Sequence, residues 1–336
     1  MQNNSQTVRI VARAAVCTRI IWCLWVVLAC LSVNAEVKRI ELPNGDVFEG
    51  EMQGDVRSGK GSYTWATGFR YVGEFKNNRM HGQGVYYWPD GRTYEGSFKD
   101  GMRDGYGVLR WINGDVYRGD FKTDQMTGRG EFTWANGDVY EGDFLNGERT
   151  GEGRLKWHTG EQYTGQFLKG KPEGEGTFNW ADGRVYQGHF RDGLKQGQGT
   201  FTWPNKNRYV GHFENDERSG FGVFYWRDGT VYYGYFDHNK TSGYGVKKSV
   251  DGHSEFQHWD SGTLLASETL EENPRCRLTL KDRLWMFRSD ECINGLAHGE
   301  GAAVSLDGRF FIARGKFVLG HLIEGQMETL IPEDSA

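Results

Sequence analysis

The chain has 336 residues, of which 49 are glycine and 6 are proline, and 14% of its residues are aromatic. This composition is typical of many short strands joined by glycine turns, and it excludes collagen-like and disordered chains. The formal net charge of −5 argues against a nucleic-acid partner, because nucleic-acid-binding proteins usually carry a strongly basic face.

Residues 1–35 have the composition of an export signal. Arg9, Arg13 and Arg19 precede an apolar run of 14 residues, 20–33, and the segment ends on the small residue Ala35. The run is shorter than the roughly 18–20 residues that a membrane-spanning helix needs. We therefore expect a signal peptide that is removed after Ala35, so that the mature protein is periplasmic or secreted.

Two other fates of this segment stay open. Without cleavage it would anchor the chain to a membrane, and residues 27–30 loosely match a bacterial lipobox, which would place a lipid on Cys30. Cleavage would leave only Cys276 and Cys292. An oxidising compartment favours a disulfide between them, and the alternative is a zinc site that also uses nearby histidines.

From residue 48 onward the sequence repeats every 23 residues. A Tyr-any-Gly triplet begins at Phe48 in the first copy and at a tyrosine in each later copy through Tyr232. A tryptophan and a Gly-any-Gly pair recur with the same step. A fixed period of this length indicates stacked copies of one small unit. Such an array offers a long surface rather than a single assembled active site.

Each unit predicts a β-hairpin, here described for residues 71–93. Apolar and polar residues alternate up to residue 75, a polar connection follows over 76–81, and residues 82–88 form the return strand. One face is then aromatic and the other solvated. The residues that we expect to form the repeat core are Tyr71, Gly73, Phe75, Gly84, Tyr86, Trp88, Tyr94, Phe98, Trp111, Tyr117, Phe121, Trp134, Tyr140, Phe144, Trp157, Tyr163, Phe167, Trp180, Tyr186, Phe190, Trp203, Tyr209, Phe213, Trp226, Tyr232 and Phe236.

Glycines mark the turns and the close contacts of the unit. Pairs such as Asp90-Gly91 suit short hairpin loops with a glycine at positive φ. Lys206 replaces this glycine in one copy, and there we expect Asn205 or Asn207 to take the strained conformation. The Gly-any-Gly pair predicts a backbone that passes close to the aromatic rings of the neighbouring strand.

The sequence Tyr-x-Gly-x-Phe, followed by Gly-x-Gly about ten residues later, resembles the membrane occupation and recognition nexus (MORN) repeat. The resemblance covers nine successive units, roughly residues 38–251. It implies an all-β fold, an elongated single-layer antiparallel sheet of stacked hairpins. It also implies a role in assembly and self-association.

The ends of the array differ from its middle. Ile40 and Leu42 predict an opening half-unit strand, and the pattern stops where Lys247 and Ser249 occupy the core columns. Stacked arrays need polar ends of this kind. We therefore divide the chain into a signal peptide at 1–35, a repeat array at 36–253 and a C-terminal cap at 254–336.

The cap retains part of the repeat. Residues 294–301 match the connection at 77–84, and Asp307-Gly308 falls where a turn belongs. We expect one degenerate repeat near residues 285–317, with strands at 276–280 and 284–288 before it. A disulfide between Cys276 and Cys292 would fasten this small core and contribute about 3 kcal/mol.

The sequence predicts a non-catalytic protein without cofactor or metal. No Gly-x-Ser-x-Gly or His-Glu-x-x-His motif occurs, and His189 and His212 belong to adjacent units about 10 Å apart, too far to share a metal ion. We expect a scaffold or binding protein whose partner is another protein or a second copy, as in a homodimer. The alternative is peripheral binding to lipid headgroups, although the hairpin connections together carry only a small positive charge.

Overall fold

The computed structural model describes residues 36–270, 276–288 and 292–329, and no helix occurs in these ranges. The expected signal peptide, its cleavage after Ala35 and a lipid on Cys30 lie outside the described residues. One sheet holds 21 strands and a second, smaller sheet follows it in the chain. The predicted all-β fold of stacked antiparallel hairpins is confirmed.

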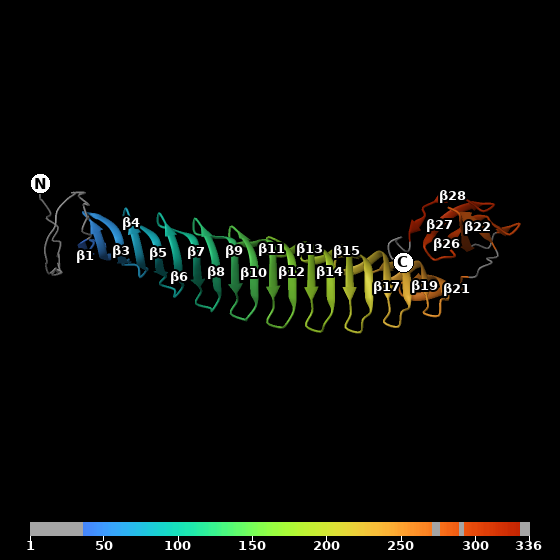
Figure 1. Cartoon of the computed structure of the whole chain (residues 1–336), viewed down its shortest axis with the longest axis horizontal. Helices are drawn as coiled ribbons and strands as arrows, with labels where there is room; N and C mark the ends of the chain where they lie inside the picture. The colour runs from blue at the N-terminus through green and yellow to red at the C-terminus, as the bar shows by residue number, and fades with distance from the viewer. Residues whose placement is uncertain (1–35, 271–275, 289–291, 330–336) are drawn as a thin grey trace, which may run out of the picture. The chain divides into compact units, whose positions relative to one another are not determined.

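The described residues divide into two units, and the first runs to His158 and includes Phe167–Gly170. Within it, consecutive strands pair antiparallel from β1 to β11 (Figure 1). The strands are β1 (Glu36–Glu41), β2 (Val47–Gln53), β3 (Val56–Thr64), β4 (Arg70–Lys76), β5 (Arg79–Tyr87), β6 (Thr93–Lys99), β7 (Met102–Arg110), β8 (Val116–Lys122), β9 (Gln125–Thr133), β10 (Val139–Leu145) and β11 (Glu148–Lys156).

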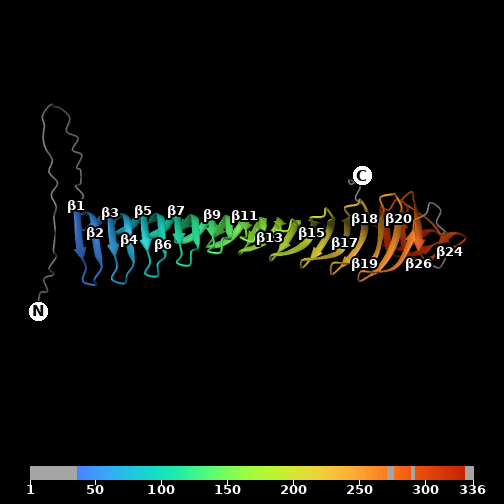
Figure 2. The ribbon, with the colours of Figure 1, turned by 90° about the horizontal axis from the view of Figure 1, so that it is seen from below.

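The second unit holds Thr159–Gln166 and the chain from Lys171 onward, and β12 (Gln162–Leu168) is shared between the units. Its consecutive strands pair antiparallel from β13 to β21, as Figure 2 shows for the strands around β18 and β19. They are β13 (Lys171–Asn179), β14 (Val185–Arg191), β15 (Leu194–Thr202), β16 (Arg208–Glu214), β17 (Glu217–Tyr225), β18 (Val231–Asp237), β19 (Lys240–Lys248), β20 (Ser254–Asp260) and β21 (Thr263–Thr269).

A tyrosine ring that lies across two facing glycines organises each hairpin from β4–β5 to β18–β19. Gly73 of β4 pairs with Gly84 of β5, and a Cβ atom on Gly84 would lie 2.5 Å from the Tyr71 ring. The Tyr71 hydroxyl donates a hydrogen bond to the Glu74 carbonyl oxygen at 2.9 Å. The same hydroxyl-to-carbonyl bond, 2.9 to 3.1 Å long, recurs at Tyr94, Tyr117, Tyr140, Tyr163, Tyr186 and Tyr209.

Phenylalanine rings join these tyrosines into a continuous core within each unit of the structure. Tyr71 packs edge-to-face on Phe75 of its own hairpin, with ring centroids 5.1 Å apart, and on Phe98 of the next hairpin at 5.0 Å. Tyr71 is fully buried and Phe75 and Phe98 nearly so. Edge-to-face pairs of this kind are worth about 0.5–1.5 kcal/mol beyond the area that they bury. Neighbouring hairpins therefore stabilise one another through these contacts.

The two glycines of the Gly-any-Gly pair act for different reasons. The second, such as Gly84, leaves room for the tyrosine ring, as the sequence predicts. The first, Gly82, has φ 58° and lies opposite a register shift between Gly73 and Glu74. That shift is a β-bulge, and a glycine relieves its strain.

The connections at the two ends of the hairpins also differ. Lys76 pairs directly with Arg79, so the predicted polar connection is only the two residues Asn77 and Asn78. Their φ values of 49° and 66° are typical of a type I′ turn, which asparagine tolerates. At the opposite end, the Gly91 amide donates to the Trp88 carbonyl oxygen at 3.1 Å and Gly91 has φ 89°.

The expectation for the turn at Lys206 is wrong. Lys206 itself takes the left-handed conformation, with φ 71°, and neither neighbouring asparagine does. Its amide donates to the Trp203 carbonyl oxygen at 2.9 Å, as Gly91 does in its own copy. The hydrogen-bond register of the array fixes which position has positive φ, whatever residue occupies it.

The sheet continues past residue 253, where the sequence predicts that the repeat pattern stops. β19 pairs with β20, and β20 with β21, to add one more hairpin. In β20, Glu255 replaces the tyrosine, Gln257 the glycine and Trp259 the phenylalanine. Without a tyrosine ring the glycine is unnecessary, and Gln257 is buried and donates to Glu255 Oε2 at 2.7 Å.

The second sheet follows the order β24-β25-β22-β23-β26-β27-β28, and β29 pairs with β27. In its β26–β27 hairpin, Gly299 pairs with Phe317 and Gly301 with Gly315. Gly82–Phe98 and Gly84–Gly96 have the same register in the array. The strands are β22 (Arg277–Leu280), β23 (Arg283–Arg288), β24 (Cys292–Ile293), β25 (Leu296–Ala297), β26 (Gly299–Ser305), β27 (Phe310–Val318), β28 (His321–Gly325) and β29 (Glu328–Thr329).

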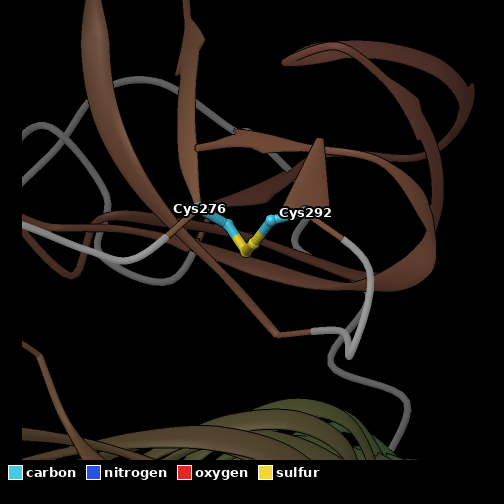
Figure 3. The surroundings of a disulfide bond; sticks show 2 residues. All are labelled: Cys276 and Cys292. Carbon is cyan, nitrogen blue, oxygen red and sulfur yellow. A yellow bond between two sulfur atoms is a disulfide. The ribbon is translucent and has the colours of Figure 1, made fainter. Parts of the chain in front are cut away.

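A disulfide joins Cys276 and Cys292 in this second sheet (Figure 3). Their Cα atoms lie 5.6 Å apart, a normal separation for a disulfide. Cys276 is buried among Leu278, Trp285 and Phe287, whereas Cys292 is exposed. The bond therefore ties the start of the sheet to its short edge strand β24.

The second sheet packs against the end of the array, on the face opposite to the tyrosines. Val223, Tyr233 and Phe256 from the array form one cluster with Val304 and Phe311 of the second sheet. In most other copies the positions of Val223 and Tyr233 hold polar residues. At the end of the array this face is thus apolar where the second sheet covers it.

We predict that Gly84→Ala destabilises the array by about 1–3 kcal/mol, because its methyl group would overlap the Tyr71 ring. Gln83→Ala is the matched control: Gln83 is exposed on the other face, and its change should stay within about 0.5 kcal/mol. Repeat arrays need not unfold in one step, so denaturant unfolding should be combined with hydrogen exchange at β4 and β5. Equal stability of the two variants would contradict the packing argument.

We predict that Lys206→Gly stabilises the protein by about 1 kcal/mol, because glycine adopts the left-handed conformation without steric strain. Lys206→Ala removes the same charge but keeps a Cβ atom, so it should give no comparable gain. The shift of the denaturation midpoint measures both effects. A gain as large for alanine as for glycine would show that the charge, not the backbone, limits stability there.

Candidate functional site

The tryptophan column does not belong to the core, in contrast to the prediction. The tyrosine and phenylalanine columns are buried, whereas Trp88 and its equivalents are half-buried and Trp226 is 37% exposed. Each tryptophan lies one residue beyond its return strand, where it begins the turn, and the Trp88 amide donates to the Arg92 carbonyl oxygen at 3.0 Å. One side of each indole therefore remains accessible.

The first pocket is a cavity of about 380 Å³ on the aromatic face in the first unit. The Arg103 guanidinium lies 5.7 Å from the Trp88 ring centroid and 5.1 Å from that of Phe121, which suits cation–π attraction. Arg103 Nε also contacts Asp124 Oδ1 at 3.0 Å. The pocket is lined by Met80, Tyr86, Trp88, Phe98, Gly101, Arg103 and Asp124.

The second pocket, about 230 Å³, repeats the first after 46 residues. Arg149 lies 5.3 Å from the Trp134 ring centroid, and its Nη2 donates to the Gly170 carbonyl oxygen at 2.7 Å. Burial lowers the pKa of Arg149. Within the described residues this guanidinium forms no ion pair. The lining residues are Met126, Phe132, Trp134, Phe144, Gly147, Glu148, Arg149, Lys169 and Gly170.

A third pocket, about 300 Å³, lies in the second unit. Its ring Phe224 follows Phe132 of the second pocket by 92 residues, which is two steps of 46, and its other rings keep the same step. The third pocket therefore shares three ring columns with the second and adds Tyr232, and Arg218 stands in it where Met126 stands in the second. The lining residues are Arg218, Phe224, Trp226, Tyr232, Phe236, Asn239, Lys240, Thr241 and Gly262.

One column explains why the first two pockets lie two repeats apart. It alternates between a cationic and an apolar residue from Arg57 to Lys195, and Arg218 then breaks the alternation. Where this column holds Arg103, the turn of the next repeat supplies Asp124, whose Oδ1 accepts from the Arg103 amide at 3.0 Å. Where it holds Met80, that turn has Gly101 instead. The column is Arg57, Met80, Arg103, Met126, Arg149, Pro172, Lys195, Arg218 and Thr241.

A second column alternates in burial with the same two-repeat step. Its buried members are Tyr63, Leu109, Leu155 and Phe201, and its half-buried members are Tyr86, Phe132, Phe178 and Phe224. The half-buried rings at Tyr86, Phe132 and Phe224 line the three pockets. The 23-residue period alone predicts neither alternation, although both are visible in the sequence when every second copy is compared.

The opposite face is polar along most of the array. His189 Nε2 lies 3.0 Å from Glu175 Oε1, an exposed pair of a kind that contributes little to stability. Over residues 36–270, 276–288 and 292–329, no group of three His, Cys, Asp or Glu side chains could hold a metal ion. The same ranges contain no helix that is long and apolar enough to cross a membrane.

Comparison with solved structures gives weak similarities. The TCP10 domain of Danio rerio CPAP is 16% identical, with a TM-score of 0.29, and the match covers 68% of this chain and 98% of that chain. The SAS-4 TCP domain of Drosophila melanogaster is 14% identical, with a TM-score of 0.25, and the match covers 53% of this chain and 85% of that chain. Similarities at these scores carry no inference about function. No curated protein matches the chain.

The family comparison is specific. A model of the MORN repeat matches nine consecutive segments, which together exceed half of the chain: residues 48–70, 71–91, 94–116, 117–139, 140–162, 163–183, 186–208, 209–231 and 232–254. These segments contain the tyrosine, glycine and phenylalanine positions that build the hairpins described above. The chain therefore belongs to the MORN repeat family.

Proposed function

We propose that the protein is a non-catalytic scaffold that binds a protein partner, or a second copy of itself, on the aromatic face of its repeat sheet. The MORN repeats support a repeat-based binding role. The observation that carries the proposal is the pair of pockets in the first unit, each with a half-buried tryptophan beside an arginine. Tryptophan, tyrosine and arginine are the residues most enriched at the energetic centres of protein interfaces.

The pockets favour a protein partner over a lipid surface. A membrane-binding surface needs several exposed cations, each worth about 1 kcal/mol near anionic lipid. In the first pocket the Arg103 side chain is only 18% exposed and forms an ion pair with Asp124, and the lining of the second pocket carries one net positive charge. The two pockets therefore offer anionic lipid fewer free cations than headgroup binding needs.

We predict that Trp88→Ala combined with Trp134→Ala reduces retention of the partner at least tenfold, because hot-spot truncations cost about 2 kcal/mol or more. Residues 36–336 would be immobilised, and retained proteins from the native host would be quantified by mass spectrometry. Glu95→Ala with Glu141→Ala, on the opposite face, is the matched control and should retain the partner. If the partner is a second copy, sedimentation velocity should show a dimer that the tryptophan variant loses.

Two results would contradict this proposal. Retained proteins could be identical for the wild type and the tryptophan variant, with the purified chain monomeric at all concentrations. Alternatively, the chain could sediment with vesicles of anionic lipid and retain no protein, which would favour peripheral lipid binding. Circular dichroism of each variant would show that its sheet is intact.

We further propose that the protein acts outside the cytoplasm. The composition of residues 1–35 and the pairing of Cys276 with Cys292 support this location, because disulfides persist in oxidising compartments.

We predict that the protein isolated from its host without reductant begins at Glu36 and is two hydrogen atoms lighter than its reduced form. The mass decrease reflects one disulfide and should disappear in Cys276→Ser. Intact mass spectrometry measures both features. A chain that starts at Met1 with free thiols would contradict export. A mass increase from a lipid on Cys30 would show that the exported protein is anchored to a membrane and not secreted.

A further inference from the structure

We infer that the first and second pockets bind one extended polypeptide, whose two apolar anchors lie six residues apart, with a carboxylate beside the anchor in the second pocket. This inference rests on the proposed function and specifies the conformation and chemistry of the partner. It concerns only the first unit, which contains both pockets.

The two pockets are related by the two-repeat step. Met80, Trp88 and Phe98 of the first pocket correspond to residues 126, 134 and 144 of the second, each 46 residues later. Two repeats contribute four strands, and neighbouring strands lie about 4.8 Å apart, so the pockets are about 19 Å apart. The apolar anchors of a bound segment must match this distance.

An extended segment matches the distance and also the direction of its side chains. Six residues span about 20 Å in a strand and about 19 Å in a polyproline II helix. Because six is a multiple of both two and three, the anchors point to the same side in either conformation. An α-helix needs about 12–13 residues for 19 Å, which is about three and a half turns and places the second anchor on the far side.

The charges of the two pockets differ, and the difference gives the bound segment a direction. In the first pocket, Asp124 already neutralises Arg103. In the second pocket, Arg149 bonds only to a carbonyl oxygen and forms no ion pair within the described residues, and Lys169 also lines the cavity. Glu148 is the one carboxylate in this lining, so the three charged groups sum to one positive charge. A carboxylate of the partner would complement it.

The probe is a phage-displayed library of random 16-residue peptides, selected on residues 36–336 and depleted on Trp88→Ala/Trp134→Ala. We expect enriched peptides to carry two large apolar residues six positions apart, with Asp or Glu next to one of them. The best peptide would be labelled, and its affinity measured by fluorescence anisotropy. Versions with spacings of five or seven residues, or with one anchor replaced by alanine, should bind at least tenfold more weakly, because the second anchor then adds no avidity.

Arg149→Met tests the charge without damage to the fold, because methionine occupies this column naturally at Met80 and Met126. We expect Arg149→Met to lower the affinity for the acidic peptide about fivefold. The affinity for a peptide with Gln in place of the acidic residue should not change. Arg103→Met is the matched control, since Asp124 already pairs with Arg103, and it should not create this difference between the two peptides.

The outcomes separate this inference from the proposed function. Peptides that depend on the tryptophans but bind equally at spacings of five, six and seven, or that become helical when bound, would overturn the inference and leave the interaction surface intact. Equal effects of Arg149→Met and Arg103→Met on binding of the acidic peptide would overturn the inference that its carboxylate lies beside the second pocket. No enrichment over the tryptophan variant would overturn both the inference and the proposed function.

Discussion

The contact between a tyrosine ring and two facing glycines is the constraint on which the structure depends. The Tyr71 ring fits only because Gly73 and Gly84 have no side chains, and its hydroxyl satisfies the Glu74 carbonyl oxygen at the bulge. The edge of Phe98 from the next hairpin completes the burial of the ring. A single hairpin therefore lacks a complete core, and stability arises between neighbours, as in other repeat proteins.

Because the tyrosine and phenylalanine columns supply this core, the surrounding columns are free to vary. Variation appears in the columns that surround the tryptophans, and it is ordered rather than random. Arg103 comes with Asp124 in the next turn and Met80 with Gly101, whereas Arg149 comes with Gly170 and donates to its carbonyl oxygen. One scaffold thus holds two kinds of repeat in alternation, and their boundaries form the pockets.

The 23-residue period was sufficient to predict the hairpins, the buried Tyr71 and Phe75 columns and the reason for Gly84, because these follow from local alternation and side-chain size. The alternation places Trp88 on the same face as Tyr86 and so predicts that it belongs to the core. The strand ends one residue before Trp88, so Trp88 begins the turn and is only half-buried. At Lys206, the preference of asparagine for positive φ predicts the wrong position, because the hydrogen-bond register of the array decides which residue adopts it. Contacts between the two sheets, such as Tyr233 on the outer face, join segments that no local pattern connects.

The alternation of Arg57, Met80, Arg103 and Met126 also bears on how such a chain can change in length. A duplication or loss of 46 residues would restore every pocket, whereas a change of 23 residues would bring two like repeats together. Lys195 and Arg218 are adjacent members of the column and are both cationic, as a single-repeat event would leave them. A pair of repeats, 46 residues long, is thus the smallest unit whose addition or loss keeps the alternation of this column.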